Sequence, residues 1–194
     1  MKTLLAATAL AATMLSALPA AAVVVTGATK IRVTNAFPDY LQVAELQAFN
    51  FSATNIALGG TATGSSVYAG FSTPDKAIDG NTGGNYYTDT IFHSLGSGAG
   101  EFLEVTFAAA NLSSISIFGR SDCCNNRDRY NIEIFNARGT TLFSGVVSAA
   151  EQTGTVTFDA AAAVPEPASW ALMIAGFGLV GIGARARRRN IVAA

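Results

Sequence analysis

The segment EFLEVTF at positions 101–107 alternates in polarity, which places Leu103, Val105 and Phe107 on one face of an extended chain. A period of two is typical of a half-buried β-strand. Other short apolar or alternating runs, separated by clusters of Gly, Asn, Ser and Asp, predict further strands at 30–34, 41–49, 112–118, 130–135, 141–147 and 153–158.

No convincing amphipathic helix interrupts these runs. Many short strands without long helices favour an antiparallel β-sandwich or jelly roll, in which functional residues lie on the loops at one end. The glycine-rich segment 59–100 is long for a plain loop, and we expect it to contain further short strands. The sequence therefore predicts an all-β fold.

The first 22 residues have the composition of a secretory signal peptide. A positive charge at Lys2 precedes an apolar run, which ends at Pro19 and three alanines. Cleavage is expected after Ala22. The alternative is a retained membrane helix, which is disfavoured because the run is short and ends in small residues.

The C-terminal segment 164–189 follows an alanine linker at 160–163 and combines Pro-Glu-Pro, an apolar run and a cluster of arginines. The apolar run 170–183 would rise only about 21 Å as a helix, against about 30 Å for a bilayer core, so we expect a temporary inner-membrane anchor. This order of features resembles the PEP-CTERM sorting tail of exported Gram-negative proteins. The resemblance implies an exosortase-type partner and delivery to the cell envelope or the extracellular matrix.

The remaining residues, 23–159, suffice for one domain. They carry seven Lys and Arg against twelve Asp and Glu, a net charge of about −5, which argues against nucleic acid as a partner. Both cysteines of the chain are adjacent, so no long-range disulfide can stabilise the fold. An exported location would still allow neighbouring thiols to oxidise.

The stretch RSDCCNNR at positions 120–127 gathers two guanidinium groups, one carboxylate and the cysteine pair within eight residues. Guanidinium groups donate hydrogen bonds to hydroxyl oxygens, and Asp122 between Arg120 and Arg127 would reduce their repulsion and orient them. Bonded sulfurs would add a compact apolar surface, and such a combination suits a sugar. A surface ion pair beside two reduced thiols remains the alternative.

The only histidine, His93, completes the spacing H-x26-R-x-D-x4-R, and this spacing with the adjacent cysteines resembles the sugar-binding motif of the F-type lectins. These lectins, also called fucolectins, are a branch of the galactose-binding-like jelly-roll domains. The resemblance covers about 55–145 and includes Asn55-Ile56-Ala57, Ala77-Ile78-Asp79-Gly80-Asn81 and Tyr86-Tyr87.

The resemblance implies that His93, Arg120 and Arg127 donate hydrogen bonds to the ring and hydroxyl oxygens of α-L-fucose. It also implies that Asp122 orients both arginines. Polar geometry must provide most of the discrimination, because burying one sugar methyl contributes only about 0.8 kcal/mol.

The resemblance further implies a disulfide between Cys123 and Cys124 that lies against the sugar ring. Tyr86 and Tyr87 would shape the pocket for the methyl group of the deoxy sugar. The chain departs from the family at 101–102, where Glu-Phe replaces the usual tryptophan-rich strand entry, so binding of some sugar is a firmer expectation than binding of fucose.

Asp79 and Asn81 flank a glycine in one tight turn and could supply the oxygen ligands that Ca²⁺ prefers. The resemblance adds Thr90, three residues before the histidine, as a further ligand of this structural calcium site. It also implies a glutamate in the final strand, which is missing at the expected place. The alternative is that Asp-Gly-Asn is an ordinary turn.

The run LQVAELQAF at 41–49 looks like that final strand moved in front of the domain, which predicts a circularly permuted arrangement. Glu45 would then complete the calcium site, with the carbonyl groups of Ala44 and Lys76 as further ligands. A carboxylate on the apolar face of this strand would need a cation or donors nearby. The alternative is that Glu45 faces solvent.

The function expected from the sequence is that of an exported glycan-binding protein without catalytic activity. A carboxylate held beside two arginines is a poor general acid, and no nucleophile stands at a recognisable spacing from the histidine. The alternative is a structural surface or matrix protein with a vestigial sugar site.

Overall fold

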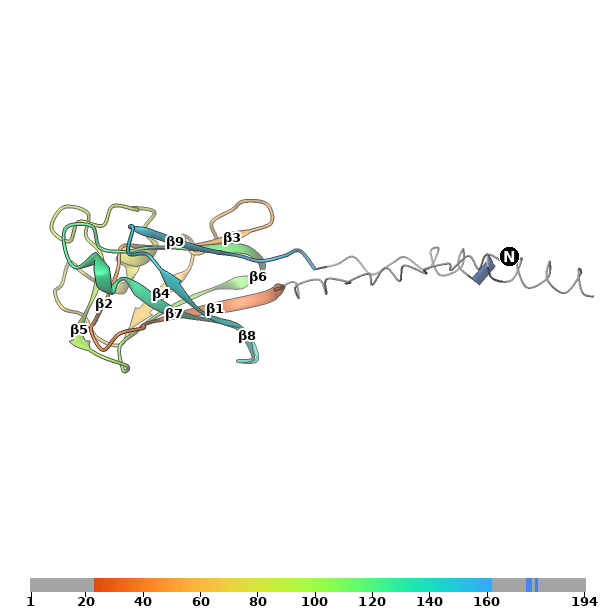
Figure 1. Ribbon diagram of the computed structural model, residues 1–194, viewed down its shortest axis with the longest axis horizontal. Coiled ribbons are helices and arrows are strands. Elements are labelled where there is room, and N and C mark those ends of the chain that lie inside the picture. Colours follow the sequence, from red (N-terminus) through yellow and green to blue (C-terminus); the bar gives the residue numbers. More distant parts are fainter. Residues whose placement is uncertain (1–22, 162–173, 176, 178–194) are drawn as a thin grey trace, which may run out of the picture. The chain divides into compact units, whose positions relative to one another are not determined.

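The computed structural model describes residues 23–161, 174–175 and 177 (Figure 1). The expected signal peptide and nearly all of the expected sorting tail therefore lie outside the described residues, and the domain boundaries remain predictions. Within the described part, no helix has the length and apolarity needed to cross a bilayer.

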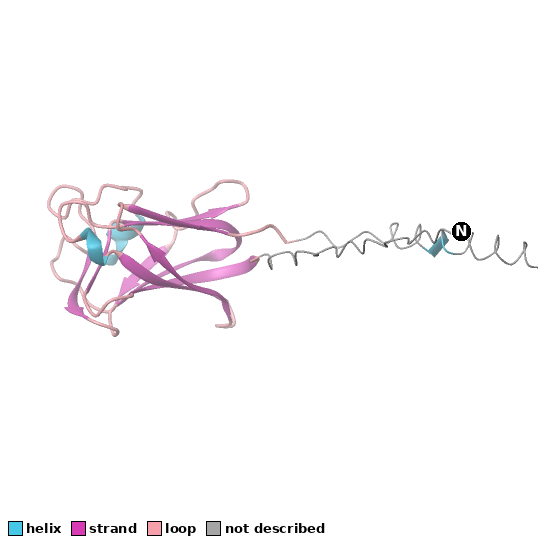
Figure 2. Ribbon diagram, viewed as in Figure 1, coloured by secondary structure: helices cyan, strands magenta, loops and turns pink. Residues whose placement is uncertain are grey.

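Between residues 23 and 161, the chain forms nine strands and two short 3₁₀ helices, as expected for an all-β domain (Figure 2). The elements are β1 (Val25–Asn35), β2 (Tyr40–Val43), β3 (Glu45–Asn50), β4 (Thr61–Gly64), η1 (Pro74–Ile78), β5 (Phe92–Ser97), β6 (Phe102–Phe118), η2 (Asn125–Arg127), β7 (Arg129–Asn136), β8 (Thr141–Ser148) and β9 (Thr153–Thr157).

The long strand β6 organises the sandwich, because its two halves pair with different neighbours. The first half lies between β1 and β4, and the second half lies between β3 and β9. Strands β7 and β8 extend the sheet beyond β1, while β2 and β5 form a separate antiparallel pair. All of these pairings are antiparallel.

Two strand predictions were wrong in their boundaries. The runs at 101–107 and 112–118 belong to the single strand β6, which continues through 108–111, where Ala110 pairs with Ala28 of β1. The run at 41–49 is interrupted at Ala44, whose amide donates to the carbonyl of Phe118. At that residue the chain leaves β5 and joins β6.

One continuous apolar core lies between the layers. Leu103 and Val105 are fully buried in it, as the alternation predicted, and Phe107 packs against it. The isoleucines of β6 and β7 add to the same core: Ile115, Ile117, Ile132 and Ile134. Burying each such side chain stabilises the fold by about 1.5–3 kcal/mol relative to exposure.

The glycine-rich segment 59–100 does contain short strands, β4 and β5, together with η1. Its loops gather at the end of the sandwich where β2 and β5 lie (Figure 1). At the start of β1, the amide of Asp159 donates to the carbonyl of Val23 at 2.8 Å, so the two ends of the domain are adjacent. Such proximity is what a circular permutation requires, and the permutation itself remains a prediction.

Candidate functional site

A pocket of about 190 Å³ opens among the loops, and it brings His93, Arg120 and Arg127 together. The remaining lining residues are Tyr40, Gln42, Tyr68, Tyr86 and Tyr87. The histidine comes from β5, whereas the two arginines flank the cysteine pair between β6 and β7. Residues separated by up to 87 positions, from Tyr40 to Arg127, therefore share one small cavity.

Arg120 is held by a two-point interaction with Asp122. Its Nε donates to Oδ1 at 2.8 Å and its Nη2 donates to Oδ2 at 2.7 Å. The same carboxylate accepts the backbone amide of Tyr86 at 3.0 Å. The bond from Arg120 lowers the pKa of Asp122 to about 2, so this carboxylate stays ionised. These two bonds leave Nη1 of Arg120, together with the second hydrogen of Nη2, as donors for a ligand.

Arg127 has a different counterion, which corrects the expectation that Asp122 orients both arginines. Nη1 of Arg127 donates to Oδ1 of Asp39 at 2.8 Å, and that oxygen also accepts the amide of Tyr40 at 2.7 Å. The pKa of Asp39 is lowered: burial acts to raise it, but the bonds from Arg127 and Tyr40 outweigh burial. Two cations thus face two anions around the pocket.

His93 is buried, and both of its ring nitrogens contact the protein. Nδ1 lies 2.7 Å from the carbonyl oxygen of Ser94, and Nε2 lies 2.6 Å from Nε2 of Gln42. Burial lowers the pKa of the imidazole, and the nearby charge of Arg120 lowers it further. The rings of Tyr40 and Tyr68 lie 5.3 and 4.7 Å from the imidazole ring, so aromatic faces surround it.

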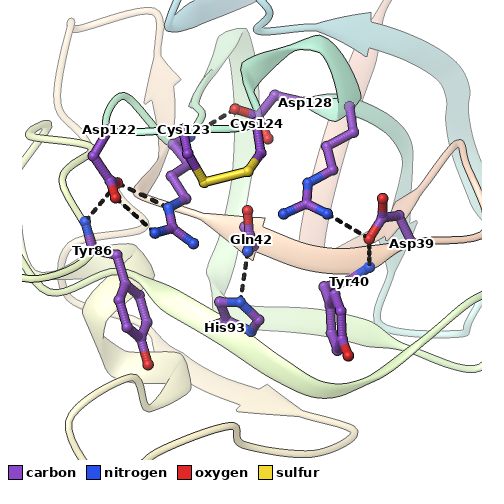
Figure 3. Close-up of a disulfide and its surroundings, with 11 residues drawn as sticks. Asp39, Tyr40, Gln42, Tyr86, His93, Asp122, Cys123, Cys124 and Asp128 are labelled. Atoms are coloured by element: carbon purple, nitrogen blue, oxygen red, sulfur yellow. Dashed lines mark hydrogen bonds and ion pairs between the residues drawn. A yellow bond between two sulfur atoms is a disulfide. The ribbon is translucent and has the colours of Figure 1, made fainter.

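Cys123 and Cys124 form a disulfide between neighbours. Figure 3 shows this disulfide on the side of Gln42 opposite to His93. Cys124 has a φ of 63°, a left-handed conformation, and its carbonyl accepts the amide of Arg127 as η2 begins. The pair of cysteines therefore sets the turn from which Arg127 projects.

Tyr86 and Tyr87 contribute unequally to the pocket. Tyr86 is buried, with its ring 4.8 Å from the guanidinium carbon of Arg120 and 5.4 Å from the ring of His93. Tyr87 is 78% exposed and stands at the rim. The buried ring therefore forms a wall of the pocket, while the exposed ring is free to contact a bound molecule.

Behind the pocket, Asp128 fixes the backbone at Arg120. Its Oδ2 accepts the amide of Arg120 at 2.7 Å, and burial raises its pKa to about 7. Asp128, like Asp39, Tyr40, Gln42 and Tyr68, was not predicted from the sequence to belong to the site. No local pattern points to them, since their contacts with the site span as many as 88 positions.

Gly84 joins the loop of Tyr86 to the loop of Arg120. Its carbonyl accepts the amide of Ser121 at 2.8 Å, and a Cβ atom at this position would collide with the carbonyl oxygen of Gly119. We expect Gly84→Ala to cost about 1–3 kcal/mol of stability, because backbone must move. Thermal unfolding measures this, with Gly70→Ala as the matched control, since a Cβ there meets nothing. Equal melting temperatures for the two variants would contradict the close approach.

Only some of the residues expected to bind calcium lie close to one another. Glu45 is fully buried, its Oε1 accepts the amide of Gly80 at 3.2 Å, and its Oε2 has no hydrogen-bond partner within the described residues. Burial raises the pKa of Glu45 to about 8, and the charge of Asp79 acts in the same direction. Glu45 therefore lies on the buried face, as expected, and the alternative that it faces solvent is wrong. A buried carboxylate near Asp79 fits a cation with oxygen ligands.

Other members of the set contact protein groups around the same turn. Asp79 accepts the amide of Asn81 at 2.9 Å, and Nζ of Lys76 lies 3.9 Å from its second oxygen. Asn81 and Thr90 both donate to the carbonyl of Asp89, at 2.9 and 2.7 Å.

Ala44 is buried next to Glu45 in the chain. Among the described residues, no three His, Cys, Asp or Glu side chains cluster as a metal site. A cation here would therefore need amide, hydroxyl and carbonyl oxygens as ligands besides the carboxylates.

Comparison with known proteins gives two similarities. Residues 163–189 match the PEP-CTERM protein-sorting motif. Fucolectin-3 of Anguilla japonica is 34% identical over 77 residues, which are 38% of this chain and 42% of the relative. The chain thus spans about two fifths of the length of this curated relative. No solved structure matches the chain. The chain combines a β-sandwich similar in part to a fucolectin with a C-terminal segment that matches a protein-sorting motif.

Proposed function

We propose that the β-sandwich binds a sugar of the fucose type in the pocket formed by His93, Arg120 and Arg127. The observation that carries this proposal is the pairing of each arginine with its own carboxylate beside aromatic rings. Guanidinium donors fixed in this way suit hydroxyl and ring oxygens, and the aromatic rings that line the pocket suit the apolar face of a sugar ring. The disulfide would contact the sugar from beside this pocket.

The similarity to a protein named Fucolectin-3 supports this proposal. We propose binding without catalysis, because Asp122 has a pKa of about 2 and is a poor proton donor at neutral pH. A glycan array probed with the full chain, with and without calcium, tests the function. We expect retention on glycans with terminal fucose or a related sugar. Silence of the folded, calcium-loaded chain would instead favour a structural matrix protein.

For calcium, we propose a structural site in which Glu45 and Asp79 are the charged ligands. Asn81, Thr90 and the carbonyl groups of Ala44 and Lys76 would complete it. The unpaired, buried oxygen of Glu45 supports this assignment. A bound cation would balance the buried negative charge and join β3 to the turn at Gly80, which lies between η1 and the pocket loops.

The PEP-CTERM match indicates an exported protein that is sorted to the cell envelope or the extracellular space. We propose further that the segment 164–189 anchors a precursor in the inner membrane until an exosortase-type enzyme processes it. Display of many copies on a surface or matrix would strengthen a weak single site through multivalency.

A further inference from the structure

Gln42 and His93 are direct cross-strand partners on β2 and β5, so their side chains lie on the same face of this strand pair. Gln42 is 1% exposed, and its Nε2 lies 2.6 Å from Nε2 of His93 (Figure 3). The main chain of Gln42 is held separately, because its carbonyl accepts the hydroxyl of Tyr130 at 2.5 Å. The backbone that carries the amide group is thus held both by strand pairing and by Tyr130.

The partners of the imidazole determine where its hydrogen lies. The carbonyl of Ser94 can only accept, so Nδ1 of His93 carries a hydrogen. An amide nitrogen can only donate, so Nε2 of His93 must offer its lone pair to Gln42. A ring with one hydrogen on Nδ1 and a lone pair on Nε2 is neutral.

The opposite orientation of the Gln42 amide is disfavoured by the surroundings. It would place Oε1 against Nε2 and demand a second ring hydrogen, and hence a buried imidazolium between Arg120 and Arg127. Oε1 has no hydrogen-bond partner within the described residues, so no other protein contact there favours the opposite orientation. Arg120 and Arg127 lower the pKa of the ring and so oppose its protonation, while Asp39 acts in the opposite direction.

We propose that Gln42 is a positioning residue that holds His93 neutral with its hydrogen on Nδ1, so that the imidazole offers no donor to a ligand. Hydroxyl recognition then falls to the two guanidinium groups, and His93 contributes its ring to the aromatic wall. This inference rests on the proposed sugar site but departs from the role that the family resemblance implies for the histidine. Because the two arginines are already paired with Asp122 and Asp39, a neutral imidazole also leaves the pocket without net charge, which suits an uncharged sugar.

Nitrogen-15 NMR of the full chain tests the proposal, because the chain has a single histidine. At neutral pH, we expect Nδ1 in the protonated range and Nε2 in the unprotonated range. Addition of saturating α-L-fucose should leave both ring nitrogens in these ranges while it shifts arginine side-chain signals. A hydrogen on Nε2, before or after addition of sugar, would overturn the proposal. The spectrum of the free protein is informative even if no sugar binds, so failure of the proposed function is distinguishable.

Gln42→Glu removes the donor to Nε2 and places a carboxylate beside it. We expect the pKa of the imidazole to rise by about one unit or more, because an opposite charge favours the imidazolium. Gln47→Glu, on the next strand and outside the pocket, is the matched control and should leave the titration unchanged. Equal titrations of the wild type and Gln42→Glu would count against the proposal, and the wild-type spectrum decides the point if the variant does not fold.

Discussion

Replacement of Arg120 by alanine is expected to weaken sugar binding at least a hundredfold. Arg120 is the guanidinium group that Asp122 holds at two points, so its free nitrogen reaches the pocket in a fixed direction. Each hydrogen bond to a charged group contributes about 1.5–3 kcal/mol, and about 2.8 kcal/mol corresponds to a hundredfold change in affinity. Titration calorimetry of the full chain with α-L-fucose measures the loss.

The matched control is Arg138→Ala, which removes the same charge from an exposed turn between β7 and β8. Its affinity should equal that of the wild type. Arg120→Lys separates charge from geometry, because an ammonium group cannot reproduce the planar fork, and it should bind almost as poorly as alanine. If a folded Arg120→Ala variant retained its affinity for the sugar, this pocket would not be the sugar-binding site.

Calcium is expected to reverse a loss of stability that the metal-free protein suffers as the pH rises. The pKa of Glu45 is about 8 in the folded chain against 4.5 for an ordinary glutamate, so the folded state keeps a proton that the unfolded state has released. Between these values stability falls with rising pH, because the unfolded chain binds fewer protons than the folded chain. From Glu45 alone, we expect a loss of about 3–4 kcal/mol between pH 5 and pH 8 in chelator.

Denaturant unfolding at several pH values, with chelator or with calcium, measures this effect. Asp128, with a pKa of about 7, contributes with the same sign, so the difference between the wild type and Glu45→Gln isolates Glu45. The variant should lose less stability with rising pH and gain less from calcium. If the free energy of unfolding changed equally with pH in the two proteins, Glu45 would not be a buried, uncompensated carboxylate. If calcium stabilised the two proteins equally, Glu45 would not be part of a metal site.

The sequence predicts the strands well because the alternation of apolar and polar residues is a local signal. Each inward-facing position of a strand is buried and therefore apolar. Leu103 and Val105 are buried as expected. The interruption at Ala44 was not predictable in this way, since it arises where one strand changes partners from β5 to β6. Pairing across distant segments leaves no mark in the local period of two.

The candidate site shows the same limit. The motif spacing and the family resemblance predicted His93, Arg120 and Arg127 as site residues, and the structure places all three around one pocket. They could not reveal Gln42 or Asp39, which act through pairings over 51 and 88 positions. The division of Arg120 and Arg127 between two separate carboxylates depends on the path of the chain between β1 and β2, and short-range spacing carries no information about it.

The most direct test of the sugar site is diffraction from crystals of the protein grown with α-L-fucose and calcium. We expect one sugar in the pocket, with its oxygens within hydrogen-bond distance of both Arg120 and Arg127 and its ring against the disulfide and Tyr86. A sugar bound at another place, with this pocket left to solvent, would contradict this expectation.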